Sequence, residues 1–195
     1  MTESKEEKSE KKASSIESWV GLMVVFSATF MGIANVKDNN IVQKMQQKQV
    51  EHNDNWGWFQ ARNIRASVYE TTADELSLTW PGETAENQKK RQDLSAKYAG
   101  MAKSQEMKMN DQKEAAETAL KDYDALNAED DKFDMCDTLL ALSLALMGIT
   151  ALTKKWALFF VALIPMSLGT YIGIAGFVGF HANLPFLDFL IQILS

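Results

Sequence analysis

The stretch SWVGLMVVFSATFMGIANV, from Ser18 to Val36, has no charged side chain, although 24% of the 195 residues are Asp, Glu, Lys or Arg. An α-helix needs about 20 mainly apolar residues to cross the hydrocarbon core of a bilayer. We therefore predict a membrane-spanning helix at residues 17–36. The mixed charges that precede the stretch, and the lack of a small-x-small cleavage site after it, favour a retained anchor over a cleaved signal peptide.

Two further stretches are free of charge, one from Thr138 to Thr153 and one from Trp156 to Phe180. They predict membrane spans at 137–153 and 156–180. The alternative is a set of buried core helices, but three such runs exceed what a soluble core of this size could cover. The expected fold is an all-α membrane protein with three transmembrane helices.

Residues 37–136 form a polar insert between the first and second spans, and its only proline is Pro81, followed by Gly82. Pro-Gly is a strong helix breaker. Both sides of it are rich in Gln, Lys, Glu, Ala, Met and Leu, which favour helices. The insert is therefore predicted to be a long extramembrane helical hairpin, coiled-coil-like, with helices at 38–79 and 84–134 and a turn at 79–83.

The heptad pattern of the returning helix is weak. The stripe that we read in it consists of Leu94, Tyr98, Met101, Gln105, Lys108, Gln112, Ala116, Leu120 and Tyr123. A stripe this polar buries little surface, so a two-helix hairpin built on it is poorly stabilised by itself. Either neighbouring copies supply the missing contacts or the hairpin is loose. The first alternative predicts a homo-oligomer.

Basic residues suggest the topology. Lys154 and Lys155 lie in the short loop between spans two and three, and the leader at 1–16 holds four lysines among its acids. By the positive-inside rule both segments are cytoplasmic, and the hairpin is periplasmic in a bacterial inner membrane. The leader is predicted to be polar and disordered. Residues 183–195 are predicted to form an interfacial amphipathic helix.

Small residues recur in the third span at Gly169, Gly173 and Gly176. Such stripes allow close approach of helix backbones inside a membrane. They pack either within one three-helix unit or between subunits, so the three glycines are candidates for a subunit interface.

Asp137 lies four residues before Ala141, at the start of the second span. Acids at membrane depth are functional candidates. Here the carboxylate is either a plain interfacial acid or a contact for an ion or a partner. The centres of the spans carry no ionisable residue, which weighs against a proton-coupled transporter.

Motifs for chemistry are missing. His52 and His181 are far apart, and neither has the spacing of a metal site. Cys136 is the only cysteine and has no histidine near it in sequence, so an inert thiol is expected. We expect no catalytic residue, no metal, no cofactor and no enzymatic activity. The net charge of −6 argues against nucleic acid as a partner.

An unusual aromatic stretch, NDNWGWFQARNIR, runs from Asn53 to Arg65 inside the insert. Its W-x-x-F-Q-A-R core resembles the uncharacterised bacterial membrane family labelled domain of unknown function 4337. The closing segment from Leu139 to Gly169, LLALSLALMGITALTKKWALFFVALIPMSLG, is also similar to that family. The resemblance implies one span, a helical polar insert and two closing spans, from about Ser18 to Phe180. It implies no known activity.

On a helix Trp56 and Phe59 share a face and can bury against the returning helix, while Gln60 can hydrogen-bond across the pair. The motif is then a packing clamp within or between chains, or alternatively a site for a ligand or partner. Aromatic residues with arginine are typical of protein interfaces. The candidate interface residues are Trp56, Trp58, Phe59, Gln60, Arg62 and Arg65.

The function expected from these features is that of a homo-oligomeric structural or scaffolding assembly in a lipid bilayer, able to recruit a partner membrane protein. A channel or transport-associated subunit is the alternative, and a membrane enzyme comes third.

Overall fold

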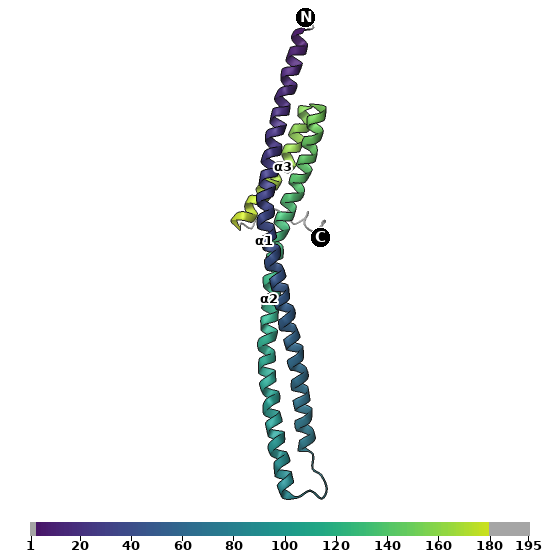
Figure 1. Cartoon of the computed structure of the whole chain (residues 1–195), viewed down its shortest axis with the longest axis vertical. Helices are drawn as coiled ribbons and strands as arrows, with labels where there is room; N and C mark the ends of the chain where they lie inside the picture. The colour runs from purple at the N-terminus through teal and green to yellow at the C-terminus, as the bar shows by residue number, and fades with distance from the viewer. Residues whose placement is uncertain (1–2, 180–195) are drawn as a thin grey trace. The chain divides into compact units, whose positions relative to one another are not determined.

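The computed structural model describes residues 3–179 of the chain, with side chains described from Ser15 onward. It contains three helices, α1 (Glu3–Ser77), α2 (Ala85–Thr153) and α3 (Trp156–Val178), and no strand within residues 3–179 (Figure 1). Each helix includes a stretch that is long and apolar enough to cross a membrane, by length and composition. The described part of the chain is therefore all-helical, with three candidate membrane spans.

Helix α1 is longer than any element predicted from the sequence. It runs without interruption from Glu3 to Ser77, through the expected leader at 1–16, the first span at 17–36 and the first helix of the insert. Polarity changes sharply at Lys37, but no proline or clustered glycine lies there to break the backbone. The change from the apolar span to the polar insert therefore does not end the helix. The interfacial helix predicted at 183–195 falls outside the described residues.

The chain divides into two compact units, one made of Met45–Asp124 and the other of Met1–Lys44 with Ala125–Ser195. In the first unit the α1 and α2 segments lie side by side and run in opposite directions (Figure 1). Three contacts set their alignment: His52 with Ala116, Arg62 with Gln105, and Tyr69 with Tyr98.

Burial along both segments of this unit follows a seven-residue repeat with alternating steps of four and three, as in a coiled coil. We call these less exposed positions the seam. On α1 the seam consists of Met45, Lys48, His52, Asn55, Phe59, Arg62, Ala66, Tyr69, Ala73 and Leu76. On α2 it consists of Arg91, Ser95, Tyr98, Ala102, Gln105, Met109, Gln112, Ala116, Ala119 and Tyr123.

The α2 stripe predicted from the sequence was therefore partly wrong. Tyr98, Gln105, Gln112, Ala116 and Tyr123 belong to the seam, whereas the other predicted members are exposed: Leu94, Met101, Lys108 and Leu120. The prediction favoured large side chains. Alanines occupy the seam instead, because small side chains let two helix backbones approach closely.

The turn between α1 and α2 occupies residues 78–84, close to the predicted 79–83. Gly82 has a φ of 83°, a left-handed conformation that glycine adopts without strain. Arg91 closes the turn: its Nε donates to Glu83 Oε1 over 2.9 Å, and its Nη1 donates to the carbonyl of Leu78. The two charged side chains of the Arg91–Glu83 ion pair are each only 17% exposed.

In the second unit, α1, α2 and α3 contribute to one core. Its largest fully buried side chains include Ile16, Ile41, Phe133, Leu140 and Met147. Buried Ser143 of α2 donates from Oγ to the carbonyl of Ala162 of α3 over 2.9 Å. Lys154, in the short loop before α3, forms a 2.8 Å ion pair with Glu17 of α1. The start of the first predicted span and the basic loop therefore lie at the same end of this unit.

Candidate functional site

The aromatic motif lies on α1 in the unit made of residues 45–124, and its rings stack along the helix. The centroids of Trp56 and Phe59 are 4.9 Å apart with an interplanar angle of 25°, and those of His52 and Trp56 are 6.3 Å apart at 15°. These steps of four and three residues place the three rings along one side of α1. Trp56 remains 39% exposed, so the stack is only half buried.

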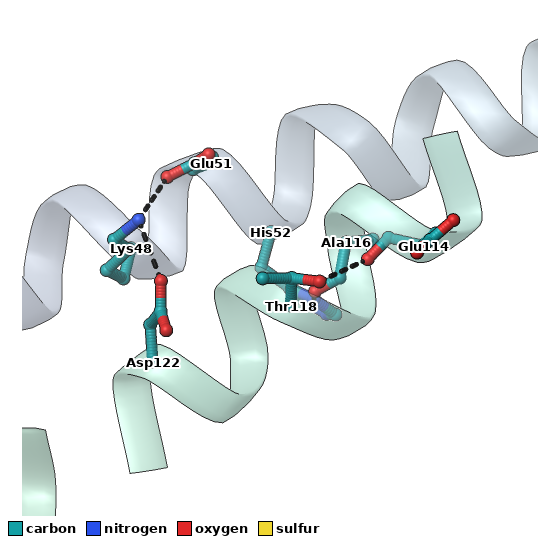
Figure 2. Close-up of polar contacts among 7 residues, drawn as sticks. All are labelled: Lys48, Glu51, His52, Glu114, Ala116, Thr118 and Asp122. Atoms are coloured by element: carbon teal, nitrogen blue, oxygen red, sulfur yellow. Dashed lines mark hydrogen bonds and ion pairs between the residues drawn. The ribbon is translucent and has the colours of Figure 1, made fainter. Parts of the chain in front are cut away.

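His52 joins this stack to the opposite helix. Its Nδ1 lies 2.9 Å from the carbonyl oxygen of Ala116 (Figure 2). A carbonyl only accepts, so Nδ1 carries the proton and donates it. Ala116 and Ala119 are fully buried, and their small side chains leave room for the imidazole to reach the α2 backbone. His52, for which no role was predicted, therefore helps to hold the two helices together.

A second polar group lies one turn from His52. Lys48 Nζ is 3.0 Å from Glu51 on its own helix and 3.0 Å from Asp122 on α2, as Figure 2 shows. The hydrogen bonds to Glu51 and then to Asp122 raise the pKa of Lys48, so this amine stays charged. The side chains of Lys48, Glu51 and Asp122 are partly exposed to solvent. Exposed ion pairs add little to stability, so the Lys48–Asp122 pair contributes mainly to the alignment of the two helices.

The remaining motif residues divide between the seam and the surface. Arg62 Nη1 donates to Gln105 Oε1 across the two helices over 3.3 Å. Gln60, predicted to make the bond across the pair, is exposed, and Trp58 and Arg65 are exposed as well. The difference follows from the heptad: position 62 is a seam position and position 60 is not. Of these residues, Arg62 bonds to the chain's own second helix and Phe59 lies at a seam position, whereas Trp56 is exposed.

Carboxylates gather in the other unit, where α1 and α2 approach one another beside the predicted spans. Asp130 of α2 lies close to Asp38 of α1, and Oδ1 of each is buried with no hydrogen-bond partner among the residues whose side chains are described. Burial, followed by the contact with Asp38, raises the pKa of Asp130 to about 7. The pKa of Asp134 is raised too, first by burial and then by Asp38.

Asp137, the candidate contact for an ion or partner, lies next to this group. Its Oδ1 is buried and has no hydrogen-bond partner among the described residues. Within the part of the chain whose side chains are described, no three His, Cys, Asp or Glu residues are arranged to hold a metal ion.

The glycines of α3 pack inside the chain. A Cβ atom on Gly173 would lie 2.6 Å from the ring of Phe30 and 2.8 Å from Cys136 Sγ. On Gly169 it would lie 3.1 Å from the carbonyl oxygen of Cys136, and on Gly176 it would lie 2.9 Å from the ring of Phe133. These neighbours belong to the same chain, as expected for the first alternative, packing within one three-helix unit; a subunit interface at these glycines stays a prediction.

Comparison with protein families returns one match. The model of the family described as "Domain of unknown function (DUF4337)" matches residues 16–179, which covers most of the chain and includes both stretches that resembled it. Comparisons with curated proteins and with solved structures return no match.

Proposed function

The chain belongs to the DUF4337 family, and from that premise we propose that it is a homo-oligomeric scaffold of a bacterial inner membrane. Three spans anchor it, and residues 37–136 form an extramembrane helical hairpin. The N-terminus is cytoplasmic and the hairpin periplasmic, as the lysines of the leader and of the loop at 154–155 favour.

One observation carries the proposal. Of the 20 seam positions between the paired helices, 13 hold alanine or a polar side chain and seven hold a large apolar or aromatic side chain. Large apolar side chains such as Val50, Trp58, Ile64, Val68 and Met107 are instead exposed. A soluble coiled coil places these two kinds of residue the other way round. Further copies of the chain could cover the exposed side chains.

Four hydroxyl groups of the second and third predicted spans weigh against the channel alternative, whereas Ser27 Oγ in the first span is buried with no hydrogen-bond partner among the residues whose side chains are described. Oγ of Ser143 and of Ser167, and Oγ1 of Thr150 and of Thr170, each donate to a backbone carbonyl. Groups that are satisfied in this way offer little to a hydrated ion. A scaffold, unlike a channel, needs no polar path through the membrane.

Native mass spectrometry of the full chain in a mild detergent tests the scaffold. The expected result is a single oligomer of defined subunit number. A monomer that keeps its full helicity by circular dichroism would contradict the proposal, because the exposed side chains would then need no covering subunit.

A further inference from the structure

The unit made of residues 45–124 has a second apolar face on α1, turned away from the seam. Val50, Gly57 and Ile64 follow one another at seven-residue spacing, with Ala61 and Val68 beside them. At 100° per residue they lie roughly opposite the seam. Ile64 is 65% exposed and Val68 is 56% exposed. We call these five residues the outer stripe of α1.

Helix α2 has a corresponding stripe at the same level. Gly100, Ser104 and Met107 lie opposite the α2 seam, and Met107 is 60% exposed. We call these three residues the outer stripe of α2. The Tyr69–Tyr98 and Arg62–Gln105 contacts align this segment with the outer stripe of α1. A Cβ on Gly100 would meet nothing within 4 Å, so the backbone there is open to close approach.

Towards the turn, mostly beyond the two stripes, the helices carry charges of opposite sign. Between Ala66 and Ser77, α1 carries Glu70, Asp74 and Glu75 and no basic residue. The aligned part of α2, from Asn87 to Gln105, carries five basic residues and one acid, Asp93. Of those five, Lys90 and Arg91 pair with Glu86 and Glu83, and Lys103 lines a hollow with Glu70 and Asp74 of its own chain. Lys89 and Lys97 remain to complement an acidic neighbour.

We propose that the outer stripe of α1 in one copy packs against the outer stripe of α2 in the next copy, with both copies pointing the same way. This inference rests on the proposed function, since copies anchored in one membrane share one orientation and equivalent residues lie at equal levels. The acids near the end of α1 then face the lysines of the neighbouring α2. Contact between two α1 faces would oppose acids to acids, and contact between two α2 faces would oppose lysines to lysines.

The interface is heterologous, because different faces of identical chains meet. Such contacts repeat from copy to copy and close into a ring when the rotation allows it. The motif residue Trp58 is 52% exposed and lies beside the outer stripe of α1, so it would fall at the edge of this interface. The outward-facing part of the aromatic motif, which takes no part in the seam, would then have a role in contact between copies.

Cysteine cross-linking tests the arrangement. In a Cys136→Ala background, which removes the only native cysteine, Val68→Cys is placed in a tagged chain and Gly100→Cys in an untagged chain. Both chains are produced together in the same membrane and oxidised. We expect a tagged–untagged pair that reducing agent separates. Ser67→Cys, exposed and about 100° further round α1, replaces Val68→Cys as the control and should cross-link at least fivefold less.

Exchanging the acids of α1 and the lysines of α2 tests the same interface independently. A chain with Glu70 and Asp74 replaced by lysine should form little oligomer alone in native mass spectrometry, as should a chain with Lys89 and Lys97 replaced by glutamate. The two chains produced together should restore the oligomer fraction, because Lys103 lines a hollow with Glu70 and Asp74 within one chain and only an exchange between chains reports on the interface. Cross-linking of Val68→Cys chains with one another alone would overturn the proposed faces, as would failure of the exchange to restore assembly. An oligomer without the tagged–untagged pair overturns only this inference, whereas a wild-type monomer overturns the scaffold as well.

Discussion

At the scale of single residues, the Asp38–Asp130 pair makes the stability of the α1–α2 contact depend on pH. The folded pKa of Asp130, about 7, lies above the value of 3.8 for a free aspartate. The folded chain therefore holds a proton that the unfolded chain releases. The contribution to stability is complete below about pH 4, falls as the pH rises to 7, and changes little above that.

We expect the thermal midpoint, followed by circular dichroism in detergent, to fall between pH 5 and pH 8. Asp130→Asn keeps a neutral side chain and should remove most of this slope. Glu129→Gln, at an exposed neighbouring position, should leave the slope unchanged. An identical slope in the Asp130→Asn variant would contradict a proton held on Asp130 in the folded chain.

Gly173 is the residue most constrained by its neighbours in α3. Gly173→Ala would bring a Cβ to 2.6 Å from the ring of Phe30. We expect a loss of about 1–3 kcal/mol in the free energy of unfolding, the usual range for an overpacked core. Gly148→Ala, where a Cβ would meet nothing within 4 Å, is the matched control and should be neutral or slightly stabilising. Unfolding titrations in mixed detergent micelles measure both variants.

At the scale of elements, the turn between α1 and α2 depends on a partly buried ion pair. Arg91→Ala removes the hydrogen bond and ion pair with Glu83 and the bond to the Leu78 carbonyl. We expect a loss of about 1–3 kcal/mol, because charge-assisted hydrogen bonds between partly buried groups exceed ordinary surface pairs. Lys90→Ala removes the exposed pair with Glu86 and should cost less than about 0.5 kcal/mol. Urea unfolding followed by circular dichroism compares the two.

The elements also show what the sequence could predict. Length and charge located the three apolar stretches, and Pro81-Gly82 located the turn, because both signals are local. The seam was found only in part, since it is formed by alanines and polar side chains that hydrophobicity does not single out. The bond from Arg62 to Gln105 and the Asp38–Asp130 contact depend on how two distant segments are aligned. A local sequence pattern does not indicate how two distant segments will be aligned.

At the scale of the whole molecule, the proposed topology can be tested at the exposed end of α1. In the Cys136→Ala background, Ser77→Cys should react with a membrane-impermeant maleimide once the outer membrane is opened and the inner membrane is intact. The reason is that the positive-inside rule places residue 77 in the periplasm. Thr153→Cys, beside the basic loop, is the control and should react only after the inner membrane is permeabilised. Reversed labelling would invert the orientation.

The strict repeat of the seam also limits how this part of the chain can change in length. A deletion in α1 alone shifts every later seam residue, and His52, Arg62 and Tyr69 can no longer all meet their partners. Removing residues 66–72 together with 96–102 takes one matched heptad, about 10 Å, from each helix. We expect circular dichroism to show preserved helicity and cooperative unfolding for the paired deletion, and broadened unfolding for either deletion alone. Insertions and deletions among relatives should accordingly occur in matched sevens.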